Sequence, residues 1–136
     1  MKPKISLITL GVTDFERSLA FYRDGLGLPL KAPVSEGEFA LFALEGTCLA
    51  LFPFKKLAAD AGLAAPPGPM GFAGFTLAHN VGSQADVDEL FRSALLIGSK
   101  PQKPPQKTFW GGYSAYITDP DGYLWEIAYN PFDDLT

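Results

Sequence analysis

The sequence is poor in the residues that disulfides, metal sites and nucleic-acid interfaces require. Its 136 residues include one cysteine, Cys48, and one histidine, His79. A single cysteine cannot form an internal disulfide, which suits a reducing compartment, so we expect a cytoplasmic protein. The 11 basic and 15 acidic residues give a net charge of −4, and the lysines and arginines form no run. Nucleic acid is therefore excluded as an expected partner, because phosphate binding needs a cluster of basic side chains.

Long apolar segments are also missing. No run approaches the roughly 18 residues that a membrane-spanning helix needs, and the opening stretch MKPKISLITLGV is too short for a secretory signal with its cleavage site. We therefore expect no membrane association. The chain instead has an ordinary globular composition, 47% hydrophobic with interspersed charges, over a length typical of one domain.

The clearest local pattern predicts a β-hairpin near the end of the chain. Residues 113–118 and 123–129 are rich in aromatic and β-branched side chains, and the sequence DPDG lies between them. Proline and aspartate favour the first positions of such a turn, and Gly122 takes the position with positive φ. We expect Thr118 to pair with Tyr123 across the turn.

Glu126 is the only ionisable residue in the second strand of this hairpin. Side chains alternate along a strand, so Glu126 shares a face with Leu124 and Ala128. The expected register places Ala115 opposite Glu126 and Tyr113 opposite Ala128. A carboxylate on an apolar face is costly unless something binds it. Glu126 therefore either lines a cavity, or is salt-bridged or solvated at an edge.

The rest of the chain predicts a β-α-β-β-β unit that occurs twice. In the first unit, a strand over residues 5–12 leads into a helix that Thr13 caps, with Glu16 completing a capping box. Three further strands are expected, at residues 28–34, 38–44 and 47–52. A connector over residues 55–70, with a short helix at 56–61, follows.

The second unit repeats this order. It begins with a strand over residues 71–81 and a helix that Ser83 caps. The proline-rich residues 101–105 form an edge strand or an extended loop, and the hairpin completes the set. We predict an α+β fold in one domain, with module one at about residues 1–54, a linker at about 55–70 and module two at about 71–136.

Two segments resemble a known family. TLGVTDFERSLAFYRDGLGL resembles the opening strand and helix of the vicinal oxygen chelate superfamily, which includes glyoxalases, bleomycin-resistance proteins and extradiol dioxygenases, and DPDGYLWEIAYNP resembles its closing hairpin. The resemblance covers essentially the whole chain. It implies two β-α-β-β-β modules that form a curled mixed sheet around a shared cavity. Together with many apolar strands whose edges need cover, it also implies a homodimer.

Metal-dependent members of that superfamily bind a divalent ion in the cavity through four strand positions. Carried over to this sequence, these positions are Leu7, Ala50, Gly74 and Glu126. Leucine, alanine and glycine cannot coordinate a metal, and a catalytic zinc ion needs at least three protein ligands. We therefore expect no metal and no other cofactor.

The resemblance and the alternation of side chains together predict the walls of the cavity: Thr9, Phe52, Thr76, Tyr113, Ala115, Leu124 and Glu126. Trp110, beside a pair of glycines, either offers a ligand a flat apolar surface or fills the open end of the sheet as core. His79 either holds the strand-to-helix turn through side-chain-to-backbone bonds or adds polarity to the pocket.

Two classes of function follow. The first is a binding protein that takes up a small, largely apolar or aromatic molecule and orients it through Glu126. The second is a glyoxalase-like lyase or isomerase, or a dioxygenase, with Glu126 as general base or as the sole retained metal ligand. Binding ranks first, because nothing evident would stabilise an enolate without a metal. The sequence leaves open the identity of the ligand and whether the cavity forms within one chain or across a dimer.

Overall fold

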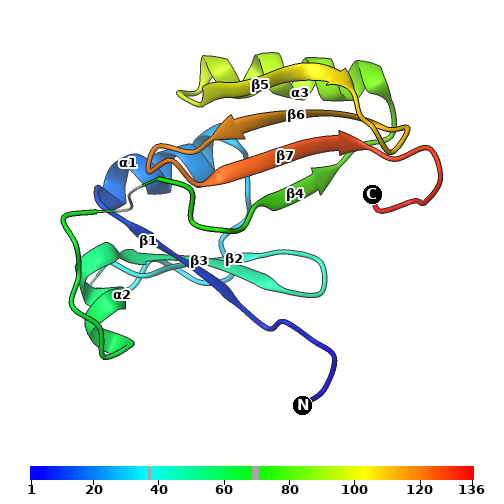
Figure 1. Cartoon of the computed structure of the whole chain (residues 1–136). Coiled ribbons are helices and arrows are strands. Elements are labelled where there is room, and N and C mark those ends of the chain that lie inside the picture. The colour runs from blue at the N-terminus through cyan, green and yellow to red at the C-terminus, as the bar shows by residue number, and fades with distance from the viewer. Residues whose placement is uncertain (37, 69–70) are drawn as a thin grey trace. The chain divides into compact units, whose positions relative to one another are not determined.

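A computed structural model describes residues 1–36, 38–68 and 71–136 of the chain (Figure 1). The chain divides into two compact units, Met1–Gly71 and Phe72–Thr136, and each contains its own mixed sheet with helices. The fold is α+β, which confirms the predicted class. The last two residues of the predicted linker, 69–70, lie outside the described residues. None of the helices in the described part of the chain is long and apolar enough to cross a membrane.

The first unit builds a three-stranded sheet in the order β1-β3-β2, with β1 parallel and β2 antiparallel to β3. Its elements are β1 (Ile8–Val12), α1 (Phe15–Leu19), the π-helix η1 (Ala20–Gly25), β2 (Ala40–Ala43), β3 (Cys48–Pro53) and α2 (Phe54–Asp60). The short helix predicted after the last strand is therefore confirmed as α2. The helix predicted after the first strand is present, but its second half is π-helical.

Two local predictions for the first unit are wrong. The N-cap of α1 is Asp14 rather than Thr13, because the Asp14 carboxylate accepts a hydrogen bond from the Arg17 backbone N–H at 3.1 Å. Aspartate is as good an N-cap as threonine, and here it lies one residue nearer the helix. The strand expected at residues 28–34 is reduced to an isolated bridge between Leu30 and Phe42. Prolines at positions 29 and 33 interrupt this segment and supply no N–H for a ladder.

The two faces of this sheet differ. One face buries large apolar side chains, and Tyr22 of η1 packs there against Phe42 with ring centroids 6.1 Å apart. The other face carries Gly11, which lies under α2. A Cβ added to Gly11 would lie 3.2 Å from the Cα of Phe54, so only glycine lets α2 come this close. Thr9 is on the same face as Gly11, and its cross-strand partner is Ala50.

The second unit builds a four-stranded sheet in the order β4-β7-β6-β5. Its elements are β4 (Leu77–Asn80), α3 (Gln84–Leu96), β5 (Lys100–Lys107), β6 (Tyr113–Thr118) and β7 (Leu124–Tyr129). The first strand is parallel to the last, as in the first unit. Ser83 caps α3 as predicted, with its hydroxyl accepting from the Asp86 N–H at 3.2 Å. The proline-rich segment is the edge strand β5, and the strand expected at 71–81 is shortened to β4.

The hairpin β6–β7 is present, but its register differs by one residue from the prediction. Thr118 pairs with Leu124 rather than Tyr123. The cause is Asp119, whose carboxylate accepts from the Tyr123 N–H at 2.8 Å while its own N–H donates to the Tyr123 carbonyl at 3.0 Å. Asp119 and Tyr123 thus close the turn as a pair, with Gly122 at φ 91° as expected. The strand ladder begins one residue later.

This register moves two predicted pocket residues to the other face of the sheet. Ala115 is fully buried in a core cluster that α3 forms with β6 and β7, whose buried members are Val87, Phe91, Ala94, Ala115, Ile117 and Ile127. The Tyr113 hydroxyl donates to the carboxylate of Asp88 on α3 at 2.9 Å. Figure 1 shows α3 running alongside the strands that it covers. The prediction that Tyr113 and Ala115 share a face with Glu126 is therefore wrong.

Candidate functional site

Glu126 lies in the middle of β7 on the face of the sheet opposite α3. Its cross-strand neighbours are Ala78 on the parallel strand β4 and Tyr116 on the antiparallel strand β6. Burial, the negative charge of Glu126 and a hydrogen bond between the two side chains raise the pKa of Tyr116 above the usual 10.0. The Tyr116 phenol therefore stays protonated at neutral pH and donates to the half-buried carboxylate.

Within the second unit, residues 72–136, no lysine, arginine or histidine forms an ion pair with Glu126. A salt bridge that holds Glu126 within the second unit is therefore absent, and the choice between a cavity and another environment for Glu126 stays a prediction. The partner that the sequence reasoning missed is Tyr116, which a one-residue error in register had placed on the opposite face. The signal for it was the Asp119 carboxylate, a good acceptor at the first position of the turn.

The side chains around this pair are small. Alternation puts Ala128 of β7 and Ser114 of β6 on the same face, and these two residues are paired with each other and buried. Ala78, on the other side of Glu126, is exposed. The Glu126 carboxylate and the Tyr116 phenol therefore lie among short side chains on β6 and β7, and Lys103 of the edge strand β5 is the partner of Tyr116 on its other side.

The other predicted pocket residues are distributed over the two units. Leu124 is half-buried on the face that carries Glu126, and Thr76 is exposed immediately before β4. Thr9 and Phe52 belong to the first unit, where both lie on the face that carries Ala50. A ligand pocket that joins these residues with Glu126 stays a prediction.

Trp110 lies in the loop between β5 and β6, and its indole covers Gly112. A Cβ at Gly112 would overlap the indole ring, so the glycine is required by the packing of Trp110 on its own loop. The Thr108 hydroxyl fixes the loop by accepting from the Gly112 N–H at 2.9 Å. Gly111 has φ +95°, a conformation that favours glycine. Trp110 is 38% exposed, so it does not fill the core, and its contact with a ligand stays a prediction.

The four positions that hold a metal in metal-dependent superfamily members do not fit a divalent ion here. Leu7 and Ala50 have aliphatic side chains, and Ala50 is fully buried. Gly74 has no side chain and adopts φ +84°. Only Glu126 offers donor atoms. Within the described residues, no group of three or more His, Cys, Asp or Glu side chains is placed to hold a metal ion.

His79 does not supply a second metal ligand beside Glu126. It pairs with Ile127 in the β4–β7 ladder, so it lies on the face of the sheet opposite Glu126. Its side chain is exposed, close to the turn that leads into α3. Neither the turn-holding role nor the pocket role predicted for His79 is tested by this placement.

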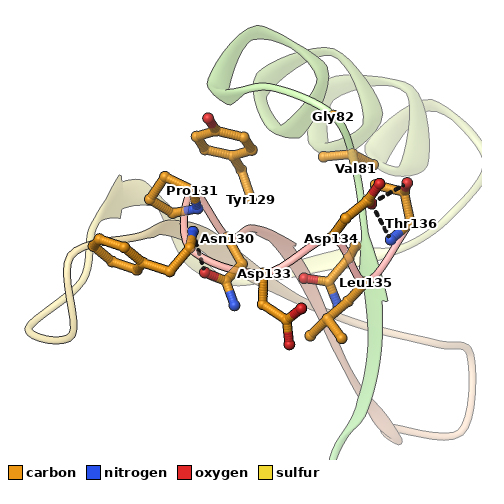
Figure 2. A pocket seen from close by; sticks show the side chains of 11 residues that line it. Val81, Gly82, Tyr129, Asn130, Pro131, Asp133, Asp134, Leu135 and Thr136 are labelled. Atoms are coloured by element: carbon orange, nitrogen blue, oxygen red, sulfur yellow. Dashed lines mark hydrogen bonds between the residues drawn. The ribbon is translucent and has the colours of Figure 1, made fainter.

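A cavity that the sequence did not predict lies at the other end of β7 (Figure 2). It has a volume of about 380 Å³ and is formed by the β4–α3 turn, the end of β7 and the C-terminal segment. Glu126 is not among its lining residues. The segment NPFDDLT has no periodic pattern, and its pair of acidic residues after an aromatic strand end was the only available signal.

Comparisons with known proteins agree with this fold. The family model described as Glyoxalase/Bleomycin resistance protein/Dioxygenase superfamily matches residues 4–127. The uncharacterized protein YraH of Bacillus subtilis (strain 168) is 34% identical over 127 residues, which cover 91% of this chain and 96% of YraH. A glyoxalase-related enzyme from Fulvimarina pelagi has 34% identity and a TM-score of 0.82, covering 95% of this chain and 89% of that one. A lactoylglutathione lyase from Agrobacterium tumefaciens has 26% identity and a TM-score of 0.70, with 96% of each chain covered.

Proposed function

Because the chain belongs to the glyoxalase/bleomycin resistance protein/dioxygenase superfamily, we propose that it binds a small, largely apolar or aromatic molecule at the sheet face that carries Glu126, without a metal ion. One observation carries the proposal. Of the four positions that ligate metal in metal-dependent members, only Glu126 has donor atoms, and its partner is a phenol rather than a cation. The carboxylate is therefore available as a hydrogen-bond acceptor for a ligand.

The Glu126–Tyr116 pair defines the polar end of the ligand. A carboxylate has two oxygens with about four acceptor sites, and the Tyr116 O–H occupies one of them. The remaining sites accept from an ammonium, amide or hydroxyl group of a ligand, whereas the negative charge disfavours a ligand carboxylate. The short side chains of Ala78 and Ala128 leave room for an apolar body beside that end.

A matched series of naphthalene compounds tests the proposal. In the presence of EDTA, 2-naphthylmethylamine and 2-naphthylmethanol are expected to raise the melting temperature of the protein, and 2-naphthoate is not. Glu126→Gln is expected to abolish the advantage of the amine, because the variant loses the charge and keeps the shape. Glu89→Gln, an exposed site on α3, serves as the control with the same charge change. An amine response that is equal in the Glu126→Gln variant, or that EDTA removes from the parent, would contradict the proposal.

The second candidate is a glyoxalase-like lyase or isomerase with Glu126 as general base. The observation in its favour is the protonated Tyr116 beside the carboxylate, because its O–H can turn from Glu126 to a developing oxyanion once the carboxylate has taken up the proton. Its test is exchange in D2O of the protons on the carbon next to the carbonyl of hydroxyacetone, followed by NMR. Exchange catalysed by the parent and lost in Glu126→Gln would favour this candidate over simple binding.

We also propose a cytoplasmic homodimer. The single cysteine supports a reducing compartment, and the exposed rings of Phe72 and Phe109 support a surface that a second copy covers. Sedimentation at tens of micromolar is expected to give the mass of two chains, and a monomer would contradict the dimer.

A further inference from the structure

The cavity at the end of β7 has the size and the walls of a small-molecule site. Its volume of about 380 Å³ is within the range of about 300–1,000 Å³ typical of such sites. Tyr129 and Val81 are half-buried in its walls, and Phe132 and Leu135 add apolar surface from the C-terminal segment. Figure 2 shows Tyr129 and Pro131 on one side of the cavity and Val81 on the other.

Local hydrogen bonds fix the shape of the C-terminal segment around this cavity. The Asn130 side-chain oxygen accepts from the Phe132 N–H at 3.0 Å. The Asp134 carboxylate accepts from the N–H of Thr136 at 3.1 Å and from its hydroxyl at 2.6 Å. The Phe132 ring also packs on the β5–β6 loop, where a Cβ on Gly111 would lie 3.0 Å from it. These contacts hold the C-terminal segment in the conformation that forms the cavity.

The charged residues that line the cavity are all acidic. Two carboxylates, Asp133 and Asp134, line it, and no lysine, arginine or histidine does. Asp134 is engaged with Thr136, and these hydrogen bonds lower the pKa of its carboxyl group, which keeps it ionised. The Asp133 side chain, in contrast, has no hydrogen bond or ion pair with any residue in the described ranges. The lining therefore includes a carboxylate side chain, that of Asp133, without a basic residue beside it among the lining residues.

We propose that this cavity binds a small organic cation, an ammonium group carried on an aromatic or aliphatic body. Asp133 supplies the counter-charge, and the rings of Tyr129 and Phe132 contact the apolar body and the cation. A bare metal ion is a poorer match, because only two carboxylate side chains belong to the lining residues and one of them is already hydrogen-bonded. This site is separate from the Glu126 face, and the proposal does not depend on the function proposed above.

Backbone amide NMR with benzyltrimethylammonium tests the proposal on the whole chain. The cation is expected to shift the amides of Val81, Gly82, Asn130 and Phe132 in a saturable way. Benzyl alcohol and phenylacetate, which share the ring and lack the cation, are expected to bind more weakly. Asp133→Asn is expected to weaken binding of the cation by about threefold, the size typical of an exposed ion pair.

Asp121→Asn is the matched control. It makes the same substitution in the β6–β7 turn, at the opposite end of β7 from the cavity, and is expected to leave the affinity unchanged. Equal weakening by Asp133→Asn and Asp121→Asn would show that the net charge of the protein attracts the cation, and would overturn the proposal. So would an absence of shifts at the cavity amides, or benzyl alcohol binding as tightly as the cation. Asp133 is exposed, so its substitution is not expected to affect folding.

Discussion

The coupling between Glu126 and Tyr116 can be measured as a difference in unfolding free energy. Hydrogen bonds to charged groups contribute about 1.5–3 kcal/mol, and partial exposure of both side chains reduces this. We therefore expect Tyr116→Phe to cost about 1 kcal/mol. Glu126→Gln keeps an acceptor oxygen for the phenol and removes the cost of a half-buried charge. Its expected effect lies between no change and a gain of about 1 kcal/mol.

The assay is urea unfolding of the ligand-free protein at pH 7, followed by circular dichroism. The double variant completes a mutant cycle, and the two side chains are expected to couple by about 0.5–1 kcal/mol. Glu89→Gln on α3 is the charge-matched control and is expected to be neutral. A loss of more than about 1.5 kcal/mol in Glu126→Gln would refute the reasoning, because it would show that the charge of Glu126 supports the fold. Zero coupling would show that the charge of Glu126 does not strengthen the hydrogen bond from Tyr116, because Glu126→Gln keeps an acceptor oxygen.

Three further predictions concern metal content, packing and pH. The protein purified without chelator is expected to carry no stoichiometric divalent ion by elemental analysis; one equivalent of Zn, Ni, Fe or Mn that disappears in Glu126→Ala would contradict the ligand assignment. Gly11→Ala is expected to cost about 1–3 kcal/mol, because its Cβ would lie 2.9 Å from Phe54 Cδ2 and 3.2 Å from its Cα. The control Gly82→Ala, with 3.6 Å to Asp86 Oδ2, is expected to be neutral or stabilising in the same urea experiment. The folded state holds the Tyr116 proton more tightly than the unfolded chain, so stability is kept below pH 10 and lost as pH rises through the raised pKa. In urea unfolding measured at a series of alkaline pH values, Tyr116→Phe is expected to lose less unfolding free energy per pH unit than the parent. An equal loss in the two proteins would contradict the raised pKa of Tyr116.

The elements that the sequence predicted well are those whose cause is local. The hairpin strands, the Ser83 cap and the edge strand β5 each follow from side chains within a few residues of the feature. The strand expected at residues 28–34 failed for the opposite reason. Its apolar residues favour a strand, yet two prolines leave only isolated bridges, and pairing with a distant strand decides the outcome.

One local hydrogen bond in the β6–β7 turn determines which side chains face Glu126. The sequence identified Glu126 as an unusual carboxylate, but the register of its strand depended on which N–H the Asp119 carboxylate accepts. The choice of Tyr123 shifts the ladder by one residue and exchanges the whole set of facing side chains. Tyr113 and Ala115 move to α3, and Tyr116 takes their place.

That exchange changes the chemistry of the site. Opposite an alanine, Glu126 would be a carboxylate desolvated by apolar neighbours, with every acceptor site empty. Opposite Tyr116, it is a carboxylate already oriented by a phenol that cannot ionise at neutral pH. Because the single O–H of Tyr116 is directed at the carboxylate, the pair offers a ligand free acceptor sites and favours ligands that donate hydrogen bonds. Both side chains of the pair are partly exposed. The specificity of the proposed binding site therefore depends on the turn at Asp119, several residues away from any group that would touch the ligand.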